Sequence, residues 1–300
     1  MSTTGTTAHL SDVVAAAHRL WPRELAESWD ASGLVCGRPD APVRRILWAV
    51  DPVQAVAAEA VRRDAQLLLT HHPLLLRGAH FLPADTDKGA VVHELVEHGI
   101  GLLASHTNAD SYDRGVSDAL IRACGVKAAR PLDPTDAERG STGIGRVGEL
   151  AEPVTLEALA QRLASAMRPT AGGVRVAGPR EGLVRRVAVC GGAGDSLFDA
   201  VRAVDADVYV TADLRHHPAS EARERALLSG GRPNLIDCSH FASEQLWLTE
   251  GARGLEAELA REGFAVQMLL SELNTDPWDF AVRPERHPGS ASTNAEAARY

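Results

Sequence analysis

Two stretches of the chain decide its fold: VRRILWAVDPVQAVAAEAVRRDAQLLLT, from Val43 to Thr70, and VRRVAVCGGAGDSLFDAVRAVDADVYVT, from Val184 to Thr211. They align without a gap at an offset of 141 residues, from 43 to 184. In each, an apolar run is followed by a turn, an amphipathic helix-like stretch and a second apolar run that ends in Thr. Each stretch therefore predicts a β-α-β unit, and their similarity predicts an internal duplication.

The similarity continues beyond these stretches. SHTNAD, from Ser105 to Asp110, is mirrored by SHFASE, from Ser239 to Glu244, and each motif follows another short apolar run. Short strands that alternate with helical patterns predict largely parallel sheets with helices packed on them. The sequence therefore predicts an α/β fold of two similar, duplicated lobes with mostly parallel, mixed sheets.

The lobe boundaries follow from composition. The stretch from Ala128 to Gly145 is rich in Pro, Asp and Gly and is interpreted as a connector, after which a helix capped near Thr155 is expected. The small, polar ends predict disorder at 1–9 and 285–300. We expect a metal-site lobe at 10–127 plus about 232–284, and a second α/β lobe at 128–231.

The bulk composition excludes several classes of protein. With 300 residues, 45% hydrophobic and 24% charged, the chain is neither wholly disordered nor a coiled coil. Its net charge of −9 argues against binding to nucleic acid or to an anionic membrane surface. No apolar run approaches the roughly 18 residues that span a bilayer. The four cysteines form no C-x-x-C pair, so reduced thiols are expected. The lack of a spanning run, together with the polar start at 1–9, predicts a cytoplasmic location.

Histidines and carboxylates gather at the predicted carboxyl ends of strands, where open α/β sheets bind ligands. His71 and His72 directly follow the apolar run at 67–70. Neighbouring side chains of extended backbone point to opposite sides, so this pair could serve two adjacent ions. His106 and Asp110 are four residues apart and share a face if the segment is helical. The same spacing recurs at His240 and Glu244.

Four imidazoles and two carboxylates suit zinc, manganese, iron, cobalt or nickel, and disfavour copper(I) or an iron–sulfur cluster. Any single pair of this kind is more often structural or at the surface. Three such groups at strand ends, two of them at duplicated positions, favour a metal site. Six ligands over two ions leave open coordination positions, where a bound water can be deprotonated and attack an electrophile.

Other residues leave alternatives open. Asp213 and His217 repeat the i, i+4 spacing and could orient a ligand or transfer a proton beside the metals. Asp30 could orient a ligand histidine or cap a helix at 29–33. The glycine-rich stretch 191–194 could cradle a phosphate, although a tight structural turn is favoured. Tyr112 is the one aromatic residue interpreted as able to stack on a base at the site.

These motifs resemble those of the Nif-three-like dinuclear metal centre family, often labelled GTP cyclohydrolase 1 type 2. The resemblance covers about residues 10 to 280 and extends to WDASGL at 29–34, GGAG at 191–194 and DVYVTAD at 207–213. It implies two metal ions per chain, in a cleft between two intertwined lobes, and a toroidal homohexamer. The ligands it implies are His71, His72, His106, Asp110, His240 and Glu244.

The chain departs from the family pattern without losing a ligand. Ala31 and Ser32 stand where Asn and a small apolar residue are common, and Ser239 replaces a frequent Gly. Ala212 also replaces a frequent Gly, which could alter the turn before Asp213, because Ala resists positive φ. The spacing leaves no room for the domain that longer members insert in mid-chain.

Two functions are consistent with these residues. The first is a metal-dependent hydrolase, in which hydroxide on two metals (zinc, manganese or iron) attacks a nucleotide-like substrate. By the family label this substrate is GTP, whose imidazole ring would open with release of formate. The second is a non-catalytic metal-binding scaffold or regulatory protein that acts through partner binding.

Overall fold

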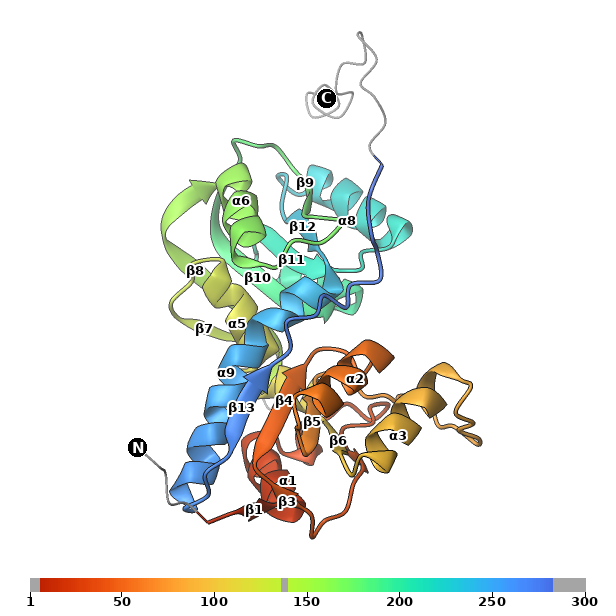
Figure 1. The fold of residues 1–300 in the computed structure, drawn as a ribbon. Helices are drawn as coiled ribbons and strands as arrows, with labels where there is room; N and C mark the ends of the chain where they lie inside the picture. The colour runs from red at the N-terminus through yellow and green to blue at the C-terminus, as the bar shows by residue number, and fades with distance from the viewer. Residues whose placement is uncertain (1–5, 136–139, 283–300) are drawn as a thin grey trace. The chain divides into compact units, whose positions relative to one another are not determined.

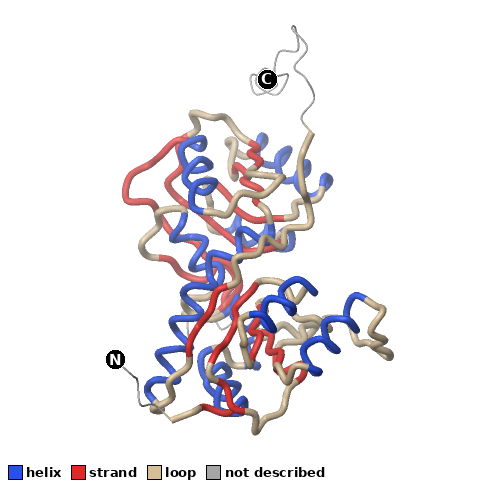
Figure 2. Tube along the Cα trace, in the orientation of Figure 1, coloured by secondary structure: helices blue, strands red, loops and turns tan. Residues whose placement is uncertain are grey.

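A computed structural model describes residues 6–135 and 140–282 and divides them into two compact units (Figure 1). The first unit comprises the described residues within 1–119, 134–144 and 244–275, and the second those within 120–133, 145–243 and 276–282. Both units contain helices and strands (Figure 2). Within the described ranges, none of the helices is both long and apolar enough to span a membrane.

The first unit is built on a five-stranded sheet with the order β13-β4-β5-β6-β2. The first four strands of this order run parallel, and β2 is antiparallel to β6. The strands are β2 (Gly33–Cys36), β4 (Arg45–Ala49), β5 (Leu67–Thr70), β6 (Gly101–Ala104) and β13 (Gln267–Leu270). The remaining elements are β1 (Ala8–His9), β3 (Pro42–Val43), α1 (Leu10–Leu20), η1 (Arg23–Leu25), α2 (Gln54–Arg62), α3 (Asp87–Glu97), α4 (Thr107–Ser111) and, shared with the second unit, α5 (Val116–Ala123) and α9 (His240–Arg261).

Successive side chains of a strand point to opposite faces of the sheet. Because successive residues of these strands are apolar, both faces of the sheet are apolar. On one face, Leu47 and Leu68 belong to a core cluster with Val56 of α2 and Leu95 of α3. The indole of Trp48, the next residue of β4, is fully buried in contact with two other indoles. Trp21 and Trp247 pack edge-to-face on it, each with a centroid distance of 5.9 Å.

The second unit contains a six-stranded sheet with the order β7-β8-β10-β11-β12-β9. Strands β10, β11 and β12 run parallel, whereas β8 and β9 pair antiparallel with β10 and β12. The strands are β7 (Ala129–Pro134), β8 (Gly143–Thr155), β9 (Arg175–Ala177), β10 (Leu183–Ala193), β11 (Val208–Ala212) and β12 (Asn234–Cys238). The helices are α6 (Leu156–Ala166), η2 (Asp195–Leu197), α7 (Phe198–Ala203) and α8 (His216–Leu228).

The two β-α-β units are confirmed down to their strand register. Ile46 of β4 pairs with Leu67 of β5, and Val187 of β10 pairs with Val208 of β11, at the same offset of 141 residues. The turn before the second strand is also shared, since Asp64 and Asp205 both adopt a left-handed conformation with φ of 50°. The expected α/β fold with duplicated lobes is therefore correct.

The organisation between the repeats differs from expectation. The stretch interpreted as a connector carries β7 and the start of β8. Strand β12 is part of the second unit, although the sequence assigned 232–284 to the first lobe, because it pairs in parallel with β11. The helix after Thr155 is confirmed as α6, and the Thr155 hydroxyl accepts the Ala158 N–H at 3.2 Å.

The predicted disorder of the chain ends is only partly addressed by the structure. Residues 1–5 and 283–300 lie outside the described residues. Within 6–9, however, the prediction is wrong, because Ala8 and His9 form β1 and pair with β3. The Ala8 side chain is buried, so contact with the first unit outweighs the small, polar character of this segment.

Candidate metal centre

His71 and His72 directly follow the carboxyl end of β5, in a bend of the chain. Their N–H groups donate to the carbonyls of Ala49, at 3.1 Å, and Val50, at 2.9 Å. The His71 ring is fully buried, whereas 22% of the His72 side chain is exposed. The ring centroids are 5.1 Å apart, so the adjacent pair places one imidazole inside the unit and the other near its surface.

His106 and Asp110 follow the neighbouring strand β6. His106 is the N-cap of α4, and its carbonyl accepts the Asp110 N–H at 3.0 Å, so the expected helical turn forms. The His106 ring lies 5.2 Å from that of His71 and 5.5 Å from that of His72. One ring nitrogen from each of the three histidines lies within 4.8 Å of the others.

Glu244, on α9, brings a buried carboxylate to these imidazoles. Its Oε1 lies 3.4 Å from Nε2 of His71, and its Oε2 lies 2.9 Å from Nε2 of His72. The carboxylate of Asp110 approaches the same His71 atom at 3.7 Å. The first unit therefore brings together five of the six residues proposed as metal ligands.

The other nitrogen of each imidazole is held by an oxygen acceptor. Nδ1 of His71 donates to the Ser105 carbonyl at 2.9 Å. Nδ1 of His72 donates to Asp51 at 2.7 Å, and that of His106 donates to Asp30 at 2.8 Å. Histidines that bind metals almost always donate their second N–H in this way, which fixes the tautomer and orients the ring. All three Nε2 atoms are thereby left as potential metal donors.

Two buried atoms of the cluster test whether a metal fits. Among the described residues, neither Nε2 of His71 nor Oδ1 of Asp110 has a hydrogen-bond partner. Buried polar atoms are almost always paired in folded proteins, so each such atom requires an explanation. A divalent cation would satisfy both, and imidazole nitrogens with carboxylate oxygens suit zinc, manganese or iron. The residues present therefore fit a metal ion.

Burial and the neighbouring carboxylates shift the pKa values of the cluster. Burial opposes a charged His72, but the carboxylates of Glu244 and Asp51 raise the pKa of His72 to about 10. Burial likewise opposes a charged His71, and Glu244 and Asp110 raise its pKa. The pKa of Asp110 is raised chiefly by burial. A cation in the same place would compete with protons for these ligand atoms.

His240, the sixth candidate, belongs to the second unit and begins α9 one helical turn before Glu244. Its Nδ1 donates to Asp213 at 2.7 Å, the arrangement also seen at His72 and His106. Of the two roles left open for Asp213, this contact favours orientation of a histidine. His217, the second residue of α8, is exposed and lies edge-on against His216, with a centroid distance of 5.3 Å. Its role in proton transfer stays a prediction.

The turn before α8 differs from the expectation for Ala212. The left-handed residue is Asp213 itself, with φ of 54°, whereas Ala212 completes strand β11. Asp adopts this conformation more readily than most residues other than Gly. The replacement of Gly by Ala at 212 therefore leaves the turn unaffected.

Asp30 both orients the candidate ligand His106 and caps a helix, but not the helix expected at 29–33. Besides binding His106, its carboxylate accepts the N–H of Thr107, the first residue of α4, at 3.1 Å. Residues 29–32 instead form a turn that leads into β2. Burial opposes charge on Asp30, but hydrogen bonds from His106, Thr107 and Ser32 hold its pKa well below the usual range.

Two residues of the site were missed by sequence reasoning. Asp51 holds His72, and it follows the end of β4, where the rule that ligands gather at strand ends would have found it. Trp29 is 58% exposed and packs edge-on against His106, with a centroid distance of 5.9 Å. Tyr112 is therefore not the one aromatic residue near the cluster.

The glycine-rich stretch supports the structural interpretation. The Gly192 N–H donates to the Ser243 hydroxyl at 3.0 Å, and φ of 65° at Gly192 lies in the left-handed region. A side chain at Gly194 would place Cβ 2.2 Å from the Tyr209 hydroxyl. These glycines permit a bulge in β10 and close packing against β11.

Comparison with known proteins agrees with the family resemblance inferred from the sequence motifs. A model of the Duf34/NIF3 family (NGG1p interacting factor 3) matches residues 8–277. The chain belongs to this family. A Duf34/NIF3 relative from Streptomyces coelicolor, named GTP cyclohydrolase 1 type 2 homolog, is 50% identical over 288 residues, covering 95% of this chain and 97% of the relative. One of the same name from Mycobacterium tuberculosis is 33% identical, covering 90% and 96%.

Solved structures show the Duf34/NIF3 fold. A Bacillus cereus protein related to NIF3 superposes with a TM-score of 0.82 over 92% of this chain and 100% of that one, at 23% identity. A Staphylococcus aureus hypothetical protein superposes with the same TM-score and coverage at 27% identity. The resemblance inferred from the His and carboxylate motifs is confirmed.

Proposed function

We propose that this chain binds two divalent metal ions and uses them as a metal-dependent hydrolase. One observation carries the proposal: the Nδ1 atoms of three imidazoles are held by Asp30, Asp51 and the Ser105 carbonyl, while Nε2 of His71 faces the carboxylates of Glu244 and Asp110 and Nε2 of His72 faces Glu244. The atoms of His71 and Asp110 that lack hydrogen bonds among the described residues support a cation within this set.

Glu244 supports two ions rather than one. Its two oxygens face different imidazoles, Oε1 toward His71 and Oε2 toward His72, as a carboxylate shared by neighbouring cations would. We add His240 to the ligand set because it lies one turn before Glu244 on α9, and side chains four residues apart share a helix face. Its hydrogen bond to Asp213 supports the same role.

Bound metal ions would supply Lewis acidity and lower the pKa of water, as in other metal-dependent hydrolases. The chain's own residues prepare the site. Asp30 and Asp51 keep two imidazoles in the tautomer that leaves Nε2 unprotonated, and burial of His71 removes competing water. The exposed indole of Trp29 offers an aromatic surface for a planar base, which supports a nucleotide-like substrate such as the GTP named for the relatives.

Metal content per chain tests the site. We expect about two transition-metal ions per chain by plasma mass spectrometry on untagged protein purified without chelator. Glu244→Gln should reduce this content while circular dichroism stays unchanged. Glu256→Gln is the matched control, because Glu256 is exposed on the same helix. Equal metal content in all three proteins would contradict the site. So would protein that contains no metal and takes up none when zinc, manganese or iron is added.

Formate release from GTP by the metal-loaded protein then tests the reaction. Turnover that Glu244→Gln abolishes would support the hydrolase. A loaded protein that releases no formate from GTP and hydrolyses no phosphoester would instead favour the metal-binding scaffold. We also propose a homohexamer, which the family resemblance supports, and light scattering should give six times the 31.9 kDa chain mass.

A further inference from the structure

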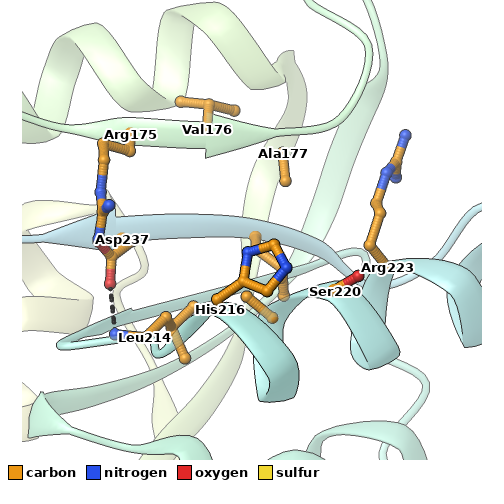
Figure 3. A pocket seen from close by; sticks show the side chains of 10 residues that line it. Arg175, Val176, Ala177, Leu214, His216, Ser220, Arg223 and Asp237 are labelled. Carbon is orange, nitrogen blue, oxygen red and sulfur yellow. Dashed lines mark hydrogen bonds and ion pairs between the residues drawn. The ribbon is translucent and has the colours of Figure 1, made fainter. Parts of the chain in front are cut away.

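A pocket of about 420 Å³ opens in the second unit, and none of the proposed metal ligands lines it. Strands β9 and β12 form one side, and α8 forms the other (Figure 3). His216, Ala219, Ser220 and Arg223 line it from α8 at the spacing i, i+3, i+4, i+7, which is one face of a helix. The pocket is thus a feature of one sheet edge and one helix face, within the size range of small-molecule sites.

The hydrogen-bond donors of this pocket are largely unused. No described residue forms a hydrogen bond or ion pair with Arg223, and its Nη1 is out of reach of solvent. The hydroxyl of Ser220 also makes no hydrogen bond to a described residue. Within the described ranges, His216 makes an edge-on ring contact with His217 but no hydrogen bond or ion pair. A partly buried guanidinium without an anion is unfavourable, since it loses hydration without compensation.

The pocket contains one carboxylate, Asp237, and both of its oxygens are already engaged. Oδ1 accepts the Leu214 N–H at 2.9 Å, and Oδ2 accepts Nε of Arg175 at 2.8 Å and also its Nη2 (Figure 3). Asp237 therefore neutralises Arg175 and cannot neutralise Arg223. Although the whole chain carries a net charge of −9, the described part of the chain leaves Arg223 in this pocket without an ion pair.

The rest of the lining is apolar. Val176 and Ala177 of β9 lie on one side, with Leu214, Ala219 and Leu235 completing the wall. Val176 is 45% exposed, unusually high for a valine within a strand. An apolar wall beside a guanidinium and a hydroxyl matches a molecule with a compact apolar body and one oxyanion group. Arg favours phosphate because its planar fork can donate two parallel hydrogen bonds to it.

We propose that this pocket binds a small phosphate monoester, with Arg223 and Ser220 holding the phosphate and the Val176 side holding the apolar body. The proposal is independent of the metal centre, because the pocket shares no residue with it. Arg175 also lines the pocket, and its Nη1, which makes no hydrogen bond to a described residue, is available as a further donor.

Calorimetric titration of the full chain with phenyl phosphate tests the proposal. Phenol, which has the same ring without phosphate, and benzoate, which carries a carboxylate, are the matched probes. Phenyl phosphate should bind saturably, and phenol should not. Arg223→Gln should weaken binding at least about tenfold, because a hydrogen-bonded ion pair is lost. Arg225→Gln, an exposed arginine of the same helix, should leave the affinity unchanged.

A phosphate could also bind at the metals, so Glu244→Gln is titrated in parallel and should retain the affinity. Loss of binding in Glu244→Gln but not in Arg223→Gln would overturn the proposal. So would the absence of saturable binding, equal weakening by Arg223→Gln and Arg225→Gln, or tighter binding of benzoate. Ser220→Ala keeps the test decisive if Arg223→Gln fails to fold, and it should weaken binding several-fold.

Discussion

The two β-α-β repeats share a backbone and differ at the ends of their strands. In the first, the Gln66 side chain accepts the N–H groups of Arg44 and Arg45. In the second, Asp207 accepts those of Arg185 and Arg186 at the same offset. These hydrogen bonds preserve the strand register. In each repeat they link the first strand to the residue that precedes the second strand.

The chemistry diverges where the shared backbone ends. His71 and His72 follow the first repeat, whereas Ala212 and Asp213 occupy the positions at the same offset in the second. Asp51, which holds His72, corresponds to Gly192, which sits in a bulge. The second repeat thus supplies a carboxylate partner to a histidine, through Asp213 and His240, rather than imidazoles of its own. Substitution at strand ends changes which side chains are available for chemistry without changing the fold.

The largest difference between the repeats is expected in how much a core residue contributes to the free energy of unfolding. Trp48 is fully buried in edge-to-face contact with Trp21 and Trp247, whereas Val189 occupies its place in the second repeat. Trp48→Ala should lower the free energy of unfolding by about 3–5 kcal/mol, because it leaves a large cavity. Val189→Ala should cost less than half as much. Urea denaturation measures both, and equal losses would mean that the indole cluster does not stabilise the first unit.

An intermediate effect is expected from the carboxylate that holds His72. Asp51→Ala should weaken metal binding about 10–100-fold, because the partners that orient metal-binding histidines contribute on this scale. Competition with a chromophoric chelator measures the affinity. Asp133→Ala, an exposed aspartate of the second unit, serves as the control. An unchanged affinity in Asp51→Ala would show that the hydrogen bond to His72 has no part in metal binding.

The smallest effect is on the pH dependence of stability. It distinguishes Asp207 from Gln66, the two side chains that accept backbone N–H groups at equivalent positions of the repeats. Burial opposes charge on Asp207, but the N–H groups of Arg186 and Arg185 and the guanidinium of Arg232 lower its pKa. This stabilisation is therefore complete above the unfolded pKa of about 3.9 and is lost as pH falls through the lower folded value. Neutral Gln66 has no such dependence.

Asp207→Gln, which copies the first repeat, should remove that acid dependence. Because solvent screens the pair, we expect a loss of about 0.5 kcal/mol at pH 7 that shrinks as the pH falls below the unfolded pKa of about 3.9. Thermal unfolding between pH 2 and 7 measures the slope. A difference between the proteins that grows as pH falls would contradict the assigned direction.

Much of the site was readable because its signals are local. The apolar runs before His71 and His106 predict strands, and strand ends predict where ligands gather. The spacing of His106 and Asp110 required only one helical turn, which α4 supplies. Asp51 and Trp29 were missed because their roles depend on contacts with residues 21 and 77 positions away, to which no local pattern refers.

The sequence by itself determined the two β-α-β repeats, their largely parallel strands and the candidate metal ligands at strand ends, because periodicity and strand ends are local properties of the chain. Tertiary structure decided which sheet β12 joins, which acceptor fixes each imidazole, and that Arg223 has no anionic partner among the described residues. These outcomes depend on hydrogen bonds and burial between distant residues, and such pairings exist only once the chain has folded.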